Sequence, residues 1–315
     1  MLLAGIDIGT LTCRLLIGRV SGDGRLTEVH SDRRILRLGE GVDREHLLRP
    51  AAIARVVETL RDWRTVINSH HVDAQVAVGT SAVRNARNRE EFLGRVKQEV
   101  GFDVEIISGE EEARRTLLGI RSGLPAGVSS MLGLDIGGGS TEFILDRPGH
   151  APIVHSIEIG VVRLTERLLT SDPPTIDEIR AARELIQKEA EQIRTRLGEL
   201  GGTTFVGTAG SITTLAAMAQ KLTTYEPVRI HNYRLGLDTI RGLEREILGR
   251  TTAQRREMPG LEAGREDVVV AGTLILRGVM ETLGFTEGLV SDVGLREGIL
   301  LDLAERLKQN VRGEA

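Results

Sequence analysis

The chain has 315 residues, of which 40% are hydrophobic and 27% are charged, and its formal net charge is −4. This composition is typical of a folded protein with two domains of ordinary size, and it excludes a disordered chain. The absence of an apolar run of about 20 residues excludes a membrane-spanning helix, while the negative charge and the 3% aromatic content argue against nucleic-acid binding.

The one cysteine, Cys13, excludes an intramolecular disulfide framework and a cysteine-based zinc site. It lies in an apolar run, so we expect a buried packing residue. Disulfide-poor chains are typical of reducing compartments, and we expect a cytoplasmic protein.

The first part of the chain predicts strands alternating with helices, in the order βββαβαβα. Glycine and proline at 123–127 interrupt this pattern, so we place a domain boundary there and expect domains over 1–124 and 125–315. The expected strands are 3–8, 14–20, 26–38, 75–78 and 104–107, and the expected helices are 50–69, 89–100 and 109–121.

The second part repeats this plan, with residues 221–264 as an insertion. The sequence leaves open whether the last helix packs back on the first domain. The expected strands are 130–136, 141–146, 153–158, 203–206 and 288–290, and the expected helices are 175–200, 211–220, 265–283 and 294–307.

Two pairs of motifs recur at one common offset of 128 residues. Asp7-Ile8-Gly9-Thr10 matches Asp135-Ile136-Gly137-Gly138, and Gly79-Thr80-Ser81 matches Gly207-Thr208-Ala209. A shared offset indicates a duplicated domain. We therefore predict an α/β fold with two duplicated ribonuclease H-like lobes, as in the actin, heat-shock chaperone and sugar-kinase superfamily, and an interdomain cleft for a phosphorylated ligand.

The strongest local motif runs from Asp135 to Ser140. Its three glycines allow a close approach of the backbone to a ligand, and successive N–H groups can form an anion site. Asp135 and Glu142 could together hold one Mg²⁺. The structural alternative is a glycine-rich hairpin with a turn-stabilising aspartate, but the duplication favours phosphate binding.

The segment Ser108–Arg114 predicts the start of a helix. Ser108 and Glu111 have the spacing of a capping box, which leaves Glu110 and Glu112 for another role, such as activating a water. An acidic helix start without catalytic function is the simpler interpretation of these residues alone.

The segment 79–88 and its counterpart 207–211 each place a glycine-threonine turn before a helix, where backbone N–H groups favour anions. Arg84 or Arg87 could contact phosphate. A capped helix with solvated arginines, and a tight strand-to-helix turn, are the structural alternatives.

Taken together, these motifs resemble the exopolyphosphatase/guanosine pentaphosphate phosphohydrolase (Ppx/GppA) family in its short, two-domain form. The resemblance covers almost the whole chain in order. The matching stretches are 7–10, 79–88, 107–114, 135–142, 160–166, 207–211 and 291–298.

The resemblance implies Mg²⁺-dependent hydrolysis of terminal phosphoanhydrides, with Glu112 as the catalytic base. It implies that Asp135, Glu142 and Asp7 serve the metal ion, and that a homodimer forms. One departure is Leu11, which stands where the family usually has asparagine and puts one ligand contact in doubt. The residues expected to bind phosphate are Thr10, Thr80, Ser81, Arg84, Gly137, Gly138, Gly139, Ser140, Thr141, Gly207, Thr208 and Gly210.

The expected function is therefore that of an exopolyphosphatase acting on inorganic polyphosphate. Removal of the 5′-phosphate from guanosine pentaphosphate is the alternative within the class, and a base-binding pocket in residues 207–234 would favour it. A sugar or acetate kinase on the same fold and a non-catalytic polyphosphate or nucleotide sensor are the alternatives from other classes.

Overall fold

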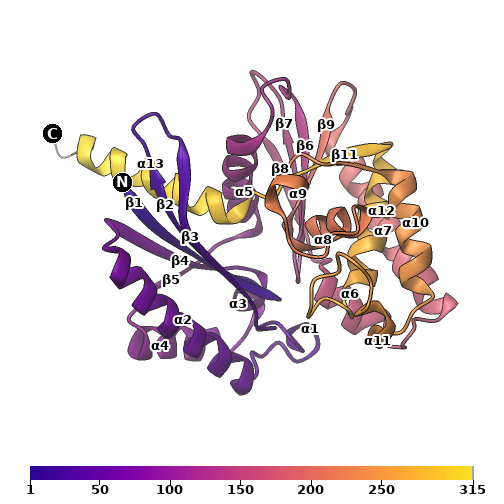
Figure 1. Cartoon of the computed structure of the whole chain (residues 1–315), viewed down its shortest axis with the longest axis horizontal. Coiled ribbons are helices and arrows are strands. Elements are labelled where there is room, and N and C mark those ends of the chain that lie inside the picture. The colour runs from indigo at the N-terminus through magenta and orange to yellow at the C-terminus, as the bar shows by residue number, and fades with distance from the viewer. Residues whose placement is uncertain (314–315) are drawn as a thin grey trace. The chain divides into compact units, whose positions relative to one another are not determined.

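The computed structural model describes residues 1–313, with side chains to residue 310. The chain forms two compact units, of which unit 1 comprises Met1–Ser122 and the segment from Val293 onward, and unit 2 comprises Gly123–Asp292 (Figure 1). This differs from the expected domains 1–124 and 125–315. The reason is the last helix, α13 (Leu295–Gly313), whose Leu300 and Leu303 pack with Leu3 and Leu16 of unit 1.

Unit 1 is built on a five-stranded sheet in the order β3-β2-β1-β4-β5. The first three strands form antiparallel hairpins, and β4 and β5 extend the sheet in parallel. This is the strand order of a ribonuclease H-like lobe, as the sequence predicted. The strands are β1 (Leu2–Ile8), β2 (Thr12–Val20), β3 (Leu26–Ile35), β4 (Ala74–Gly79) and β5 (Val104–Ile106).

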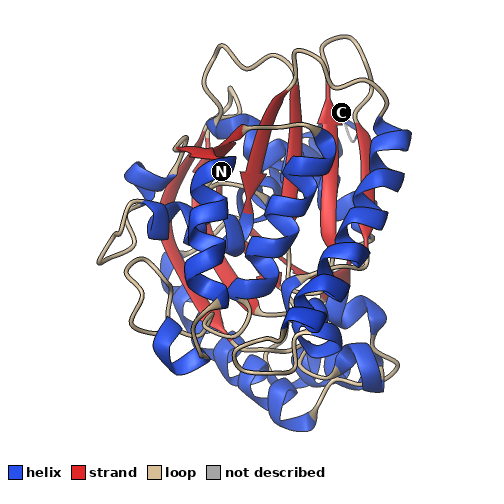
Figure 2. Cartoon of the chain, turned by 90° about the vertical axis from the view of Figure 1, so that its right-hand side faces the viewer, coloured by secondary structure: helices blue, strands red, loops and turns tan. Residues whose placement is uncertain are grey.

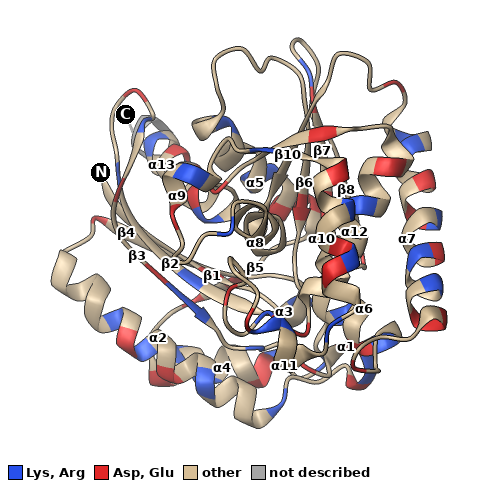
Figure 3. Ribbon diagram, turned by 45° about the vertical axis from the view of Figure 1, so that its right-hand side comes forward, with Lys and Arg blue, Asp and Glu red and all other residues tan. Residues whose placement is uncertain are grey.

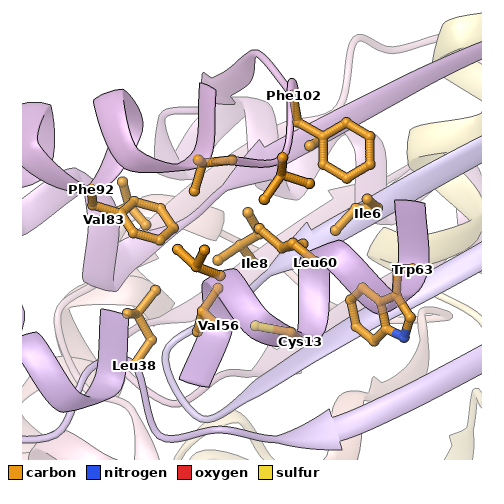
Figure 4. Close-up of a cluster of buried hydrophobic side chains, with 14 of the residues drawn as sticks. Ile6, Ile8, Cys13, Leu38, Val56, Leu60, Trp63, Val83, Phe92 and Phe102 are labelled. Atoms are coloured by element: carbon orange, nitrogen blue, oxygen red, sulfur yellow. The ribbon is translucent and has the colours of Figure 1, made fainter. Parts of the chain in front are cut away.

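Successive side chains of β1 point to opposite faces of the sheet, and different helices cover the two faces. Ala4, Ile6 and Ile8 belong to the large apolar core that includes Trp63 of α2 and Phe92 of α4 (Figure 4). The opposite face is covered by α13, and Asp7 lies on it. The helices are α1 (Val42–Glu45), α2 (Pro50–His70), α3 (Ser81–Asn85), α4 (Arg89–Glu99) and α5 (Gly109–Gly123).

Unit 2 has a six-stranded sheet in the order β10-β11-β9-β6-β7-β8. The hairpins β6–β7 and β7–β8 are antiparallel, whereas β9 and β11 run parallel to β6. The strands are β6 (Met131–Ile136), β7 (Thr141–Asp146), β8 (Ile153–Ile157), β9 (Thr204–Thr208), β10 (Arg234–Gly236) and β11 (Glu287–Val290).

Helices cover the strands of unit 2 (Figure 2). The expected helix 175–200 is observed as α7, which begins with a capping box between Thr175 and Glu178 and carries charges of both signs (Figure 3). The sequence did not predict α6 or the elements of the insertion, and α12 begins four residues later than expected. The helices are α6 (Val161–Leu168), α7 (Ile176–Leu197), α8 (Ala209–Ala219), α9 (Pro227–Ile230), α10 (Leu237–Leu248), α11 (Thr252–Arg255) and α12 (Val269–Leu283).

No helix among the described residues is long and apolar enough to cross a membrane. Cys13 is buried, as expected, and burial raises the pKa of its thiol.

The predicted duplication is visible in the geometry of the first hairpin of each unit. The turn is closed by a hydrogen bond from Gly9 N to Thr12 O of 3.2 Å in unit 1, and from Gly137 N to Ser140 O of 3.0 Å in unit 2. The repeat is less regular in the parallel pairing, because Gly79 lies opposite Ile8 whereas Gly207 lies opposite Leu134. As a result, Thr208 is the direct neighbour of Asp135 across the sheet.

Candidate active-site residues in the two units

The β6–β7 hairpin brings Asp135 and Glu142 together as direct register partners. Both side chains are buried, and Glu142 Oε1 accepts a hydrogen bond of 2.8 Å from Ser156 Oγ on β8. Carboxylates that face each other on neighbouring strands repel, unless a cation or a proton lies between them. Oxygen ligands of this kind suit Mg²⁺, so the donor set fits that ion.

Within residues 1–313, no group of three or more His, Cys, Asp or Glu side chains is arranged to hold a metal ion. Mg²⁺ is usually bound by one or two carboxylates together with water and substrate phosphates. The pair therefore suits a cation that arrives with a phosphorylated ligand.

The glycine loop between β6 and β7 has a fixed orientation. The carbonyl oxygen of Gly137 accepts from Val161 N at 3.0 Å, and that of Gly138 accepts from Val162 N at 2.9 Å, both at the start of α6. In a trans peptide the C=O and the following N–H point in opposite directions. The N–H groups of Gly138 and Gly139 therefore point away from α6, as an anion site requires.

The side chain of Thr141 has a partner within the protein. It is fully buried, and its hydroxyl donates to the carbonyl oxygen of Ile159 at 2.5 Å. The hydroxyl proton expected to contact phosphate is thus used to hold the segment that precedes α6.

The second turn of unit 2 joins β9 to α8. Thr208 Oγ1 donates to Ser291 O at 3.0 Å, and Ala209 has a φ of 69°, which is costly for a residue with a Cβ. Gly210 lies against Arg265, since a Cβ at residue 210 would be 2.2 Å from an Arg265 nitrogen. Arg265 is buried and ion-paired with Glu262 at 2.5 Å.

The β1–β2 hairpin of unit 1 carries a different pair at the equivalent positions. Asp7 faces Arg14 in the register, and the two side chains form an ion pair of 2.8 Å. Burial raises the pKa of the Asp7 carboxyl, and the charge of Arg14 opposes this shift. Asp7, expected to serve the metal ion, thus already has a cationic partner.

Residues at the ends of β1 and β4 lie close together in unit 1. Thr80 N donates to Ile8 O at 3.2 Å, and Thr10 O accepts from Gly39 N at 2.9 Å. Thr10, Thr80 and Ser81 are all buried. Leu11, which stands where the family usually has asparagine, is also buried.

The three glutamates in the first turn of α5 differ in their burial and in their contacts. Ser108 Oγ accepts from Glu111 N at 3.1 Å, which is the backbone half of the predicted capping box. The Glu111 side chain instead pairs with Arg114 and Arg115, and hydrogen bonding by Arg114 is the main cause of its lowered pKa. Glu110 is exposed, whereas Glu112 is buried.

Glu112 contacts Arg84, as an active-site pair would require. Arg84 Nη1 donates to Glu112 Oε2 at 3.2 Å and to Ile107 O at 2.8 Å. Among the described residues, Arg84 Nη2 is buried and has no hydrogen-bond partner. Arg87, the other arginine that the sequence offered, is exposed.

The expected site residues therefore fall into two groups. Sequence reasoning did not single out Arg14, Ser156 or Arg265. The 128-residue offset could have identified Arg14 as the counterpart of Glu142, whereas no local motif marks Ser156 or Arg265. The group in unit 1 comprises Asp7, Thr10, Thr80, Ser81, Arg84 and Glu112, and the group in unit 2 comprises Asp135, Gly137, Gly138, Gly139, Ser140, Thr141, Glu142, Gly207, Thr208 and Gly210.

Two ribonuclease H-like lobes with a glycine-rich hairpin and buried acidic residues define a class of phosphate-handling proteins. Comparison with known proteins specifies the family, since the model of the Ppx/GppA phosphatase family matches residues 17–307. The chain belongs to this family, as its motifs indicated.

Individual relatives agree with this assignment. The chain is 38% identical to Exopolyphosphatase 2 of Mycobacterium tuberculosis, over 96% of this chain and 98% of that protein. It is 30% identical to the guanosine-5′-triphosphate,3′-diphosphate pyrophosphatase of Aeromonas hydrophila, over 96% of this chain and 59% of that protein.

Solved structures give the same result. The structure of the Aquifex aeolicus family member matches with a TM-score of 0.82 and 34% identity, covering 98% of this chain and 99% of that one. An exopolyphosphatase from Cytophaga hutchinsonii matches with a TM-score of 0.87 and 28% identity, covering 96% and 98%.

Proposed function

We propose that this protein is an exopolyphosphatase that hydrolyses the terminal phosphoanhydride of inorganic polyphosphate and releases orthophosphate. The observation that carries the proposal is the buried Asp135–Glu142 pair next to a glycine loop whose N–H groups point away from α6. The near full-length similarity of this chain to a protein named Exopolyphosphatase 2 supports polyphosphate as the substrate.

Asp135 and Glu142 would hold a divalent cation, preferably Mg²⁺. When bound, the ion would neutralise phosphate charge and polarise the phosphoryl group. Ser156 would orient the Glu142 carboxylate through the hydrogen bond to its Oε1. We assign Asp7 a supporting role, because its charge is balanced by Arg14.

The backbone of the glycine loop would bind the terminal phosphate. The N–H groups of Gly138 and Gly139 would donate to its oxygens, where charge develops during phosphoryl transfer.

Glu112 would act as the general base that deprotonates the attacking water. Arg84 would hold the Glu112 carboxylate through Nη1, and its buried Nη2 would donate to a phosphate oxygen. Removal of a positioned general base typically lowers a rate about 10²–10⁴-fold.

Guanosine pentaphosphate is the second candidate substrate, because a relative with 30% identity is named for activity on that nucleotide. A polyphosphate chain and the nucleotide present the same terminal phosphoanhydride, so the catalytic residues do not distinguish them. A kinase would require turnover that depends on an acceptor, and a sensor would bind without release of phosphate.

The test is orthophosphate release, with Mg²⁺, from polyphosphate and guanosine pentaphosphate side by side. Glu112→Gln is the test variant, and the exposed neighbour Glu110→Gln is its matched control. We expect release from polyphosphate that Glu112→Gln abolishes and Glu110→Gln preserves. Faster turnover of the nucleotide would favour the second candidate, and binding of both without release would indicate a sensor.

We also propose a cytoplasmic homodimer, as expected from the family resemblance. Light scattering of the purified protein across a concentration series would test the oligomeric state. A mass equal to one chain throughout the series would refute the dimer.

A further inference from the structure

The start of α6 supports the glycine loop of unit 2. The first N–H groups of a helix lack partners within the helix and commonly bind anions. In α6 these groups are engaged, since Val161 N and Val162 N donate to the carbonyls of Gly137 and Gly138, and Arg163 N also reaches Gly138 O at 3.3 Å. The N–H groups at the helix start thus bond to the loop, so an anion would bind to the N–H groups of the loop and not to those of the helix.

The hydrogen bonds from α6 determine whether the loop presents N–H groups or carbonyl groups to a ligand. Glycine peptides rotate more freely than others, because no Cβ restricts them. A rotated Gly138 peptide would turn a carbonyl oxygen toward a bound phosphate, and the two would repel. The donors of α6 favour the orientation in which N–H groups face the ligand side.

Gly160, the residue before α6, makes this contact possible. A Cβ at this position would lie 2.4 Å from the carbonyl carbon and oxygen of Gly138 and 2.5 Å from Gly139 N. Its φ of −129° and ψ of 170° are open to any residue. Glycine is therefore required by the close approach of two backbones and not by its conformational freedom.

We propose that Gly160 is a positioning residue for phosphate, which lets the start of α6 hold the glycine loop with its N–H groups toward the ligand. Thr141 also binds this segment, through its hydrogen bond to Ile159 O. This inference rests on the proposed phosphate-binding role of the loop.

The test compares three variants. Gly160→Ala adds a methyl group where the backbone of Gly138 lies, and Thr141→Val removes the bond to Ile159 without adding bulk near Gly138. Gly201→Ala is the matched control, because a Cβ there would have no atom within 4 Å. The readouts are kcat and KM for polyphosphate, inhibition by orthophosphate, Mn²⁺ affinity and the thermal unfolding midpoint.

We expect Gly160→Ala to lower kcat/KM and to weaken orthophosphate inhibition by about 10²-fold, the cost of a displacement of about 1 Å in an active site. Thr141→Val should weaken both in the same direction by a smaller factor. Mn²⁺ affinity should fall much less than phosphate affinity in both, because the carboxylates of Asp135 and Glu142 are untouched.

Two results would overturn the inference. One is unchanged phosphate inhibition in Gly160→Ala. The other is a parallel loss of Mn²⁺ and phosphate binding in Thr141→Val, which would mean that the segment supports the whole unit. A wild-type protein that neither binds nor releases phosphate would instead refute the proposed function, so the two failures are distinguishable.

Discussion

Glu142 lies directly across the β6–β7 hairpin from Asp135, and the two positions that correspond to them in the β1–β2 hairpin hold Arg14 and Asp7. Duplication has thus produced two hairpins of the same geometry with different charges. The first contains its own cation, a guanidinium 2.8 Å from the carboxylate. The second places two carboxylates together, a pair of oxygen ligands that suits a divalent cation.

Glu142→Arg should convert the second hairpin into a copy of the first. We expect the variant to fold and to lose divalent-cation binding, because the new guanidinium would pair with Asp135 as Arg14 does with Asp7. Wild-type protein should gain about 2.7 kcal/mol of stability at a cation concentration 100 times the Kd, and the variant should gain none. Thermal unfolding with and without Mn²⁺ measures this difference.

Glu142→Gln is the companion variant, since it removes the charge without supplying a cation. It should also lose Mn²⁺ affinity but retain the bond from Ser156. Undiminished Mn²⁺ binding in Glu142→Arg would show that the ion is held elsewhere.

Arg84→Gln should lower kcat/KM by about 10²-fold, because the variant loses both the hold on Glu112 and a charged phosphate donor. Arg84→Lys should recover only part of the activity, since an ammonium lacks the two-pronged geometry of a guanidinium. Arg87→Gln is the matched control in the same segment and is exposed. Equal activity of the two glutamine variants would exclude a specific role for Arg84.

Gly298→Ala should destabilise unit 1 by about 1–3 kcal/mol, the usual cost of overpacking. A Cβ there would lie 1.7 Å from the carbonyl oxygen of Arg115, so α13 would have to move away from α5, the helix that carries Glu112. Gly94→Ala in α4 is the control, because its Cβ would have open space. Chemical denaturation of both variants measures the difference, and equal midpoints would contradict the close helix packing.

Glu178→Gln should alter the acid stability of the protein. Hydrogen bonds from Thr175 and Thr170 lower the pKa of Glu178 to about 2. A lowered pKa stabilises the fold above the ordinary glutamate value, and this contribution is lost as the pH falls toward the lowered value. The unfolding temperatures of variant and wild type should therefore differ most at neutral pH and converge as the pH falls to about 2. A difference that is constant with pH would refute the role of the charge.

Much of the fold could be predicted from local patterns. The βββαβαβα order and the division near residue 123 follow from apolar periodicity and from glycine and proline breaks. The placement of α13 could not be predicted, because helical periodicity marks an apolar face without identifying the sheet that this face covers. The helix α6 was missed although Val161, Leu164 and Leu168 have the i, i+3, i+7 spacing of one helix face, so the local pattern could have identified it.

The candidate site could be predicted only where its residues form motifs. Asp135 and Glu142 were identified in this way, whereas Glu112 was chosen over Glu110 through the family resemblance. Glu112 is buried and Glu110 is exposed, which favours the same choice. Arg265 lies beneath Gly210 through tertiary packing, which leaves no signal in the neighbouring sequence. Thr141 has a hydroxyl group of the kind that binds phosphate, but this hydroxyl donates its proton to the carbonyl oxygen of Ile159.

The return of α13 to unit 1 also affects how the chain is made. Unit 2 is continuous in sequence, so it can fold as soon as residue 292 has left the ribosome. Unit 1 begins earlier but is completed later, because Leu3 and Leu16 remain uncovered until Leu300 and Leu303 arrive. The half of the molecule that carries Glu112 is thus finished last, and a chain interrupted before residue 293 would present an open apolar sheet face to chaperones and proteases.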